Sequence, residues 1–282
     1  MVAVRIAIIG GSGIYQPEIV KKAKEVKVET PYGMVLPLLG EVEGHEVYFL
    51  SRHGNKHAMP PHRVNYQANI WGLKALGVEA VIATAAVGSL NPEMKPGDCV
   101  LVDQFIDFTK NRRQTFFDGG ENGVVHMDMT EPYCPALRKT LAVAAREVAA
   151  RPGAEFGVYE KGVYVCTEGP RFETPAEIKA YALLGGDVVG MTSCPEVVLA
   201  REAGICYATI AMVTNLAAGI AGKILTHEEV LEVVAKNNDK IWAILQKTLE
   251  KVEETYMPET CGCREAGRYF QEIFGHILGE NR

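Results

Sequence analysis

Strand-like and helix-like segments alternate along most of this chain, and no other feature restricts its fold as strongly. Residues 4–9 are apolar except for Arg5, which is typical of a strand that is buried on both faces of a sheet. Further strands are expected at residues 46–50, 80–84, 99–102, 162–166 and 206–213, and helices at 64–76, 135–150, 175–184 and 195–203. This order predicts an α/β fold in which helices cover both faces of a mostly parallel or mixed sheet.

The C-terminal part has a strongly helical pattern, from residue 228 to about residue 256. Thr226 followed by Glu229 forms the pattern of a capping box, which predicts that the helix begins there. The 282 residues contain no internal repeat, low-complexity tract or linker, and one α/β domain can have this length. We therefore expect a single domain, residues 1–282, with a helical C-terminal extension over about 226–282.

Composition and charge disfavour several classes of protein. The net charge of −6 argues against a nucleic-acid binder, because such binding depends on clustered Lys and Arg. No run approaches the roughly 20 apolar residues that a membrane span needs. The apolar N-terminus lacks a basic leader and a cleavage site, so we interpret it as a strand and not as a signal peptide. We expect a cytoplasmic protein.

Seven cysteines occur, and five of them lie in apolar context, as reduced core cysteines do. Cys261 and Cys263 lie instead in a polar, helix-breaking stretch near the C-terminus. They can be two ordinary thiols, a disulfide or part of a metal contact, and the sequence leaves these three interpretations open. A disulfide in a cytosolic protein would point to a thermophilic source.

A glycine-rich turn, Gly10-Gly11-Ser12-Gly13, follows the first strand. Backbone N–H groups of such a turn can approach an anion closely, and Ser12 adds a hydroxyl donor. The third glycine of the dinucleotide-binding fingerprint and the Lys of a P-loop are both missing. The turn alone is therefore compatible with a phosphate site, with a nucleotide-binding dehydrogenase and with a purely structural bend.

Arg52 and His53 follow the second strand-like run and supply charged donors that suit phosphate. The alternatives are a solvated basic turn and a metal site built from His53, His57 and His62. Glycine and proline residues in this segment break the helix that would place His53 and His57 on one face, and no Glu follows His53 as in a zincin. No metal is therefore expected.

Two further segments suit a ligand. The run TAAVGSL, residues 84–90, is rich in small residues, which leave room at the sheet edge where α/β proteins bind ligands. In the turn TEGPRFET, residues 167–174, Phe172 can stack on a planar heterocycle while Glu173 accepts a ring N–H. Tight packing and an interaction of Glu173 with a helix dipole are the structural alternatives.

Two polar residues and one long loop are further candidates for a functional role. Asn215 ends an apolar strand, where a buried amide needs partners and offers both a donor and an acceptor. His227 lies at the first position of the long helix. The irregular stretch 110–135 contains His126, and a loop of this length in a compact domain is usually functional or part of an interface.

Taken together, these segments are similar to the trimeric purine nucleoside phosphorylase and methylthioadenosine phosphorylase family. The similarity extends over roughly residues 4–245 and is carried by GGSG, RHG, VNYQANIWGLK, TAAVGSL, EGPRFET, MTSCPEVVLAREAGICYA and THEEVL. It implies a single α/β domain around a central mixed, partly barrel-like sheet flanked by helices. It also implies a homotrimer or a dimer of trimers, with inorganic phosphate as co-substrate and no cofactor.

The resemblance assigns roles to individual residues. Phosphate would contact Ser12, Arg52, His53, Ala85, Ala86 and Thr192. The base and ribose would contact Phe172, Glu173, Met191, Asn215, Ala217 and His227. His126 falls in the segment that family members insert into a neighbouring subunit's pocket.

Three positions bear on the substrate. Methylthioadenosine phosphorylases carry an Asp-x-Asp pair over the base, a small residue after the aromatic residue and an apolar residue near the methylthio group. This chain has Asn215-Leu216-Ala217, Glu173 and His227 at those positions. Asn215 can donate to O6 or N7 of hypoxanthine or guanine, and Glu173 can accept from N1–H. An Asp at 215 would face O6 with a second acceptor, and such an unpaired buried group costs about 1–3 kcal/mol.

We therefore expect reversible phosphorolysis of inosine and guanosine to the free base and ribose 1-phosphate, with Asn215, Glu173 and His53 as the catalytic residues. Phosphate would attack the anomeric carbon through positioning and electrostatics, without a covalent intermediate. The alternative within the family is phosphorolysis of methylthioinosine or methylthioadenosine. From outside it, a nucleotide-binding dehydrogenase and a non-catalytic nucleoside-binding protein remain alternatives.

Overall fold

The first strand separates the hydrophobic core into two sides. The computed structural model describes residues 4–11, 21–54, 58–220, 222 and 226–279. β1 (Ile6–Gly10) is buried along its whole length, as its unbroken apolar sequence predicts. Ile6 and Ile8 pack into one hydrophobic cluster and Ala7 and Ile9 into another, because successive side chains of a strand point to opposite faces.

The secondary structure alternates as predicted for much of the chain. The strands after β1 are β2 (Lys21–Glu25), β3 (Val28–Thr30), β4 (Gly33–Val35), β5 (Leu38–Val42), β6 (His45–Ser51), β7 (Ala80–Ser89), β8 (Cys99–Leu101), β9 (Gln104–Phe108), β10 (Val158–Tyr159), β11 (Val163–Thr167), β12 (Val188–Gly190) and β13 (Cys206–Leu216). The α-helices are α1 (Tyr66–Ala75), α2 (Pro135–Ala149), α3 (Pro175–Leu183), α4 (Ser193–Glu202), α5 (His227–Thr255), α6 (Cys263–Ala266) and α7 (Arg268–Gly279). Short 3-10 helices are η3 (Pro61–Arg63), η4 (Gly120–Asn122) and η5 (Pro258–Thr260).

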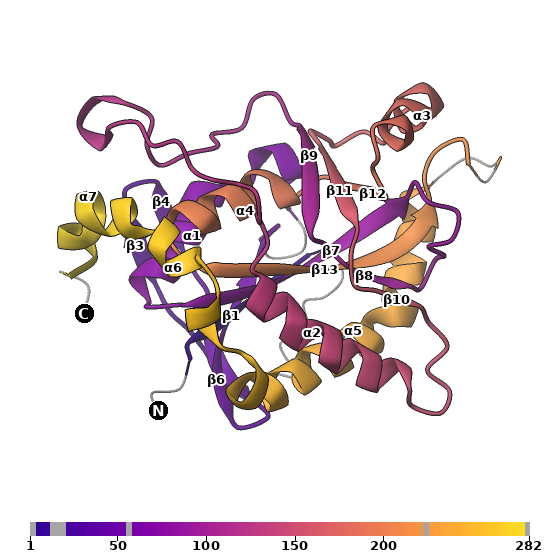
Figure 1. Cartoon of the computed structure of the whole chain (residues 1–282), viewed down its shortest axis with the longest axis horizontal. Helices are drawn as coiled ribbons and strands as arrows, with labels where there is room; N and C mark the ends of the chain where they lie inside the picture. The colour runs from indigo at the N-terminus through magenta and orange to yellow at the C-terminus, as the bar shows by residue number, and fades with distance from the viewer. Residues whose placement is uncertain (1–3, 12–20, 55–57, 221, 223–225, 280–282) are drawn as a thin grey trace.

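One mixed, 11-stranded sheet forms the centre of the molecule, with its main path in the order β10-β8-β13-β7-β1-β6-β5-β2. The central strands β13, β7, β1 and β6 are parallel, whereas β8 and β5 are antiparallel to their central neighbours. The sheet branches at β7, because the start of β7 pairs with β1 and its end pairs with β12, which continues to β11 and β9. Figure 1 shows this branch with α3 beside it.

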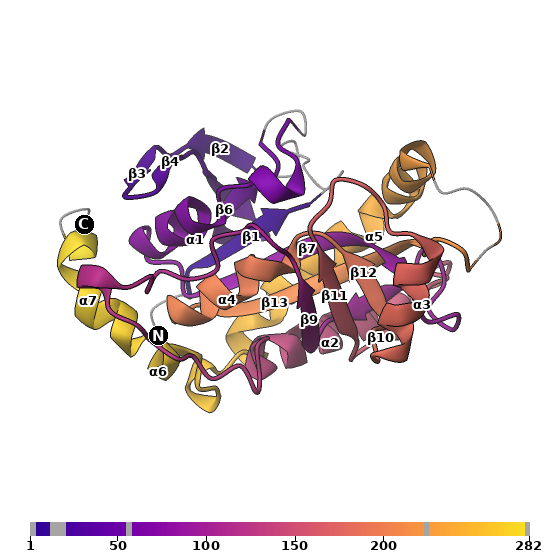
Figure 2. The same cartoon turned by 90° about the horizontal axis from the view of Figure 1, so that it is seen from above.

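Helices cover both faces of the sheet (Figures 1 and 2). On one face, α1 and α4 contribute to the cluster that contains Ala7 and Ile9, and the C-terminal α7 adds Phe270 and Phe274 against Trp71. On the other face, α2 and α5 pack together over the cluster that contains Ile6 and Ile8. This arrangement confirms the predicted fold class, a mixed α/β domain with a central sheet flanked by helices.

The element boundaries agree closely with the predicted helices and with the strands at β6, β8 and β11. β7 and β13 begin at the predicted residues, 80 and 206, but extend beyond the predicted ends, to Ser89 and Leu216. Thr226 caps α5 by accepting a hydrogen bond from the backbone N–H of Glu229 at 3.2 Å, as predicted. Strands β2 to β5, β9, β10 and β12 were not predicted, since they are short or, like β2, exposed at every residue. The division into residues 1–282 with an extension from 226 stays a prediction. Within the described residues, no helix is long and apolar enough to cross a membrane.

Candidate active site

A cavity of about 430 Å³ opens at the ends of β7 and β13, at the edge of the parallel strands where α/β sheets bind ligands. Its lining includes most of the predicted site residues: Arg52, His53, Ala85, Ala86, Phe172, Glu173, Met191, Thr192, Asn215 and Ala217. Two predicted contacts, Ser12 and the side chain of His227, lie outside the described residues. The structure therefore brings together segments that are far apart in the sequence, as the phosphorylase hypothesis requires.

Arg52 is held by a buried ion pair that the sequence analysis missed. Its Nε and Nη2 atoms donate to the Glu196 carboxylate at 2.7 and 2.6 Å, and Nη1 donates to the Thr84 carbonyl at 2.9 Å. The Tyr207 hydroxyl also donates to Glu196, at 2.7 Å. The side chains of Arg52 and Glu196 are 1% and 0% exposed.

This ion pair changes how Arg52 can bind an anion. Burial by itself lowers the pKa of the guanidinium, but the neighbouring Glu196 carboxylate raises it, and the pKa of Arg52 stays above its ordinary value. A guanidinium carries five N–H groups, and the protein accepts three of them. Arg52 is therefore a rigid donor at the cavity, and its charge is already paired within the protein.

The described part of the glycine turn has a packing role. The backbone N–H of Gly11 donates to the Thr84 hydroxyl at 3.0 Å and so is used within the protein. A Cβ atom on Gly11 would lie 2.7 Å from the Thr84 carbonyl oxygen and 3.2 Å from Arg52 Nη1. Only glycine permits this close approach of the turn to β7, which places the segment at the Arg52 side of the cavity.

His53 is buried beside Arg52, and its Nδ1 lies 2.8 Å from the carbonyl oxygen of Met59. Because a carbonyl can only accept, Nδ1 carries a proton, and this bond fixes the orientation of the ring. The metal alternative gains no support in the described part of the chain, where the group of side chains able to hold an ion includes neither His53 nor His62. His57 lies outside the described residues.

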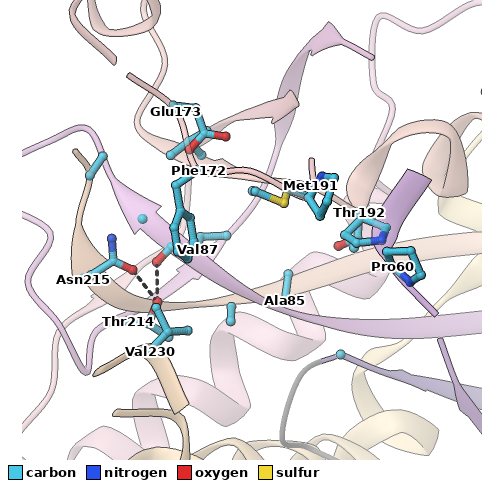
Figure 3. Close-up of a pocket in the computed structure, with 18 of the residues that line it drawn as sticks. Pro60, Ala85, Val87, Phe172, Glu173, Met191, Thr192, Thr214, Asn215 and Val230 are labelled. Atoms are coloured by element: carbon cyan, nitrogen blue, oxygen red, sulfur yellow. Dashed lines mark hydrogen bonds between the residues drawn. The ribbon is translucent and has the colours of Figure 1, made fainter. Parts of the chain in front are cut away.

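Asn215 is oriented by a β-bulge at the end of β13. Val213 pairs with Val87 and Asn215 with Gly88, so Thr214 is the extra residue, and bulges of this kind re-aim side chains. Asn215 Nδ2 donates to the Leu216 carbonyl at 3.0 Å, and the Thr214 hydroxyl lies 2.8 Å from Asn215 Oδ1 (Figure 3). Since the Leu216 carbonyl can only accept, the amide atom facing it must be the nitrogen. The amide is therefore held in one orientation, with its Oδ1 against Thr214.

Glu173 and Phe172 lie in the turn before α3, on the other side of the cavity (Figure 3). The Thr167 hydroxyl, at the end of β11, donates to Glu173 Oε1 at 2.6 Å. This bond leaves the second carboxylate oxygen as an acceptor for a ligand. Phe172 is 37% exposed, so an apolar side chain is available beside the carboxylate.

Arg112, in the long irregular stretch, joins two walls of the cavity and was also missed. Its Nη1 donates to the carbonyls of Met191 and Cys194 at 2.8 and 2.6 Å, and its Nη2 to those of Thr167 and Glu168 at 3.1 and 2.7 Å. The side chain is 2% exposed. Arg112 thus connects the loop that carries Met191 with the strand end that holds Glu173.

Comparison with known proteins identifies the family. The model of the phosphorylase superfamily matches residues 5–250. This chain belongs to the phosphorylase superfamily. The match extends over every residue that lines the cavity, and it confirms the resemblance inferred from the sequence motifs.

Relatives from this superfamily match almost the whole chain. The 6-oxopurine nucleoside phosphorylase of Pyrococcus furiosus is 53% identical over 93% of this chain and 97% of its own length. A probable 6-oxopurine nucleoside phosphorylase of Moorella thermoacetica is 55% identical, covering 92% of this chain and 96% of its own. Among solved structures, a methylthioadenosine phosphorylase from Schistosoma mansoni in complex with adenine is 34% identical with a TM-score of 0.87, covering 96% of this chain and 98% of its own.

One of the predicted site residues, His126, lies away from the cavity. His126 is exposed in the irregular stretch and does not line the cavity of its own chain. A residue in such a place is compatible with a role in a neighbouring subunit, which stays a prediction. The remaining part of the stretch is anchored by Arg112 and by the buried rings of Phe116 and Phe117.

Proposed function

We propose that this protein is a purine nucleoside phosphorylase for 6-oxopurine nucleosides, which converts inosine or guanosine and inorganic phosphate reversibly into the free base and ribose 1-phosphate. The observation that carries the proposal is the fixed amide of Asn215, which lines the cavity together with the Glu173 carboxylate. Four relatives at 51–55% identity are named 6-oxopurine nucleoside phosphorylase or probable 6-oxopurine nucleoside phosphorylase, and these names support the proposal.

The two side chains match the edge of a 6-oxopurine. Asn215 Nδ2 has two N–H groups; one binds Leu216, and the other can donate to O6 or N7 of the base. Glu173 can accept from N1–H through the carboxylate oxygen that Thr167 does not hold. Adenine presents an unprotonated N1, which would face the Glu173 carboxylate with a lone pair. A buried mismatch of this kind costs about 1–3 kcal/mol, so the pair favours the 6-oxopurine.

The same contacts can stabilise the transition state. As the glycosidic bond stretches, the leaving purine gains negative charge on O6 and N7, where the Asn215 N–H would donate. Phosphate, held by Arg52, His53, Thr192 and the backbone near Ala86, with Ser12 beyond the described residues, would attack the anomeric carbon from the opposite face. Arg52 is suited to this task because its ion pair with Glu196 fixes the guanidinium before phosphate binds.

A methylthio nucleoside is the second candidate substrate. Val230, on the first turn of α5, presents an apolar side chain to the cavity, and relatives named as S-methyl-5′-thioadenosine and probable S-methyl-5′-thioinosine phosphorylases are 49% and 47% identical. In the preferred proposal, His227 at the start of α5 meets the 5′-hydroxyl instead.

We further propose the assembly and surroundings that the family resemblance implies. His126 would complete the pocket of a neighbouring subunit in a homotrimer or dimer of trimers. Phosphate would be the only co-reactant, without a cofactor, and the protein would work in the cytoplasm. The described cysteines are all free, as is usual for cytosolic proteins.

A single assay separates these candidates. The protein is incubated with inosine, guanosine, adenosine, methylthioadenosine or methylthioinosine, with and without phosphate, and base release is followed. We expect cleavage of inosine and guanosine only when phosphate is present, with ribose 1-phosphate formed in equal amount. Cleavage without phosphate would indicate a hydrolase, and a preference for the methylthio nucleosides would favour the second candidate.

A further inference from the structure

Thr192, one of the residues assigned to phosphate, lies between β12 and α4. It is the N-cap residue of α4, but its side chain makes no capping hydrogen bond to the first turn of that helix. A threonine in this position usually uses its hydroxyl for such a bond. Thr192 instead lines the cavity, and Figure 3 shows it well separated from Asn215 and Glu173, the residues assigned to the base. Something other than its own cap therefore has to fix its position.

The buried phenol of Tyr164 makes a direct contact with Thr192. Tyr164 lies on β11 and is 0% exposed, and its hydroxyl accepts a hydrogen bond from the backbone N–H of Thr192 at 3.3 Å. Burial raises the pKa of Tyr164, although its hydrogen bonds with Thr192 act in the opposite direction. The phenol therefore keeps its proton and contacts Thr192 as a neutral group.

Gly190 makes this contact possible. β11 and β12 are parallel, and Tyr164 pairs with Val188, so its side chain reaches along β12 to residue 190. A Cβ atom on Gly190 would overlap the Tyr164 hydroxyl oxygen and would lie 2.7 Å from Cζ of its ring. A residue larger than glycine would therefore displace the ring and separate the hydroxyl from Thr192.

Other contacts of this segment reach the neighbours of Thr192. Arg112 binds the carbonyls of Met191 and Cys194, which lie on either side of it in the sequence. The backbone N–H of Thr192 itself donates to the Tyr164 hydroxyl. Because Thr192 is 8% exposed, removing this acceptor leaves its N–H buried and unpaired. The Tyr164 hydroxyl is therefore the atom through which the position of Thr192 can be changed while the rest of the cavity wall is kept.

We propose that Tyr164 is a positioning residue for the phosphate site, whose hydroxyl holds the Thr192 backbone so that the Thr192 side chain faces phosphate. Tyr164 does not line the cavity, so it acts through Thr192. The inference rests on the proposed function, because it takes Thr192 to bind phosphate. It deepens that function by separating affinity for phosphate from recognition of the base, which depends on Asn215 and Glu173.

The test compares Tyr164→Phe with the wild type in steady-state phosphorolysis of inosine, with phosphate varied at saturating inosine. Losing one hydrogen bond to the phosphate site should raise the KM for phosphate about two- to twelvefold. The kcat at saturating phosphate, the KM for inosine and the inosine-to-adenosine ratio of kcat/KM should stay within about twofold of the wild type. A merely structural role would instead lower the active fraction, and with it kcat, at an unchanged KM for phosphate.

Tyr48→Phe is the matched control, because Tyr48 is a buried tyrosine of the same hydrophobic cluster and does not line the cavity. It should keep the wild-type KM for phosphate. Gly190→Ala offers a second route to the loss, since the added methyl group displaces the Tyr164 hydroxyl, and it serves if Tyr164→Phe does not fold.

The outcomes separate this inference from the proposed function. If the wild type cleaves inosine only with phosphate, a wild-type KM for phosphate in Tyr164→Phe or in Gly190→Ala would overturn the positioning role and leave the proposed function intact. A rise of the same size in Tyr48→Phe would also overturn it, because the effect would not be specific to the contact with Thr192. Cleavage by the wild type without phosphate would overturn both.

Discussion

The hydroxyl of Thr214 should control which purine base the protein prefers, although Thr214 was not among the predicted site residues. In the structure this hydroxyl lies 2.8 Å from Asn215 Oδ1, and the residue is 3% exposed. Thr214→Val removes the hydroxyl and keeps the shape of the side chain. The amide of Asn215 then keeps only its bond to Leu216 and can leave the orientation in which Nδ2 faces the base.

The Thr214 hydroxyl carries one proton and has two acceptors within reach, Asn215 Oδ1 at 2.8 Å and the Val87 carbonyl at 3.1 Å. The expected size is that of the shorter bond, the one to Asn215. A neutral hydrogen bond contributes about 0.5–1.5 kcal/mol, which corresponds to a decrease of about two- to twelvefold in kcat/KM for inosine. Adenosine has no O6 and offers the Asn215 N–H only N7, so its kcat/KM should change less. The KM for phosphate should be unaffected, because Arg52 and His53 lie outside this contact.

The assay is steady-state phosphorolysis of inosine and adenosine by wild type, Thr214→Val and Thr214→Ser. The serine variant keeps a hydroxyl and serves as the matched control, with an inosine-to-adenosine ratio of kcat/KM close to that of the wild type. An equal loss on both nucleosides in Thr214→Val, or an unchanged ratio, would refute the positioning role of Thr214.

Three further changes test other parts of the account. Asn215→Asp should shift the preference toward 6-aminopurines, since a carboxylate accepts from N6; an unchanged inosine-to-adenosine ratio of kcat/KM would remove Asn215 from the specificity role. Arg112→Lys keeps the charge but cannot bind the four carbonyls at once, so kcat should fall at least about tenfold while the far-ultraviolet circular dichroism spectrum stays native. A wild-type kcat in this variant would show that the two cavity walls joined by Arg112 do not depend on its side chain. Burial raises the pKa of Glu202 to about 7, despite the hydrogen bonds that its carboxylate accepts from Thr115 and Phe116. Between pH 4.5 and 7 the folded state therefore holds a proton that the unfolded state has lost. The free energy of unfolding should decrease by up to about 3 kcal/mol over this range. Glu202→Gln should abolish that decrease in denaturant titrations, and an equal decrease in the variant would assign it to other groups.

Local sequence patterns were sufficient to predict the central fold and many residues of the site. Unbroken apolar runs identified the buried central strands, because parallel strands in a covered sheet are apolar on both faces. Since parallel strands end at one edge, the polar and small residues after them had to lie together, and the cavity contains them. Exposed or very short strands such as β2 and β12 carry no such pattern and were missed.

The residues that hold the site were harder to predict because their partners are distant in the sequence. Arg52 and Glu196 are separated by 144 positions, and nothing local shows that the Arg52 charge is paired. An acidic residue inside the apolar run CPEVVLA was the available signal, since a buried carboxylate needs a partner. Arg112 binds four carbonyl oxygens, which leave no trace in the side-chain sequence. Thr214 acts through a bulge that depends on the pairing of β13 with β7.

The most direct measurement of the central claim is the ratio of kcat/KM for inosine to that for adenosine at saturating phosphate. Glu173 and the fixed Asn215 amide together predict a ratio of at least about five, from at least one buried polar mismatch of about 1–3 kcal/mol with adenine. A ratio near or below one, with both nucleosides cleaved by phosphate, would contradict the assignment to 6-oxopurines.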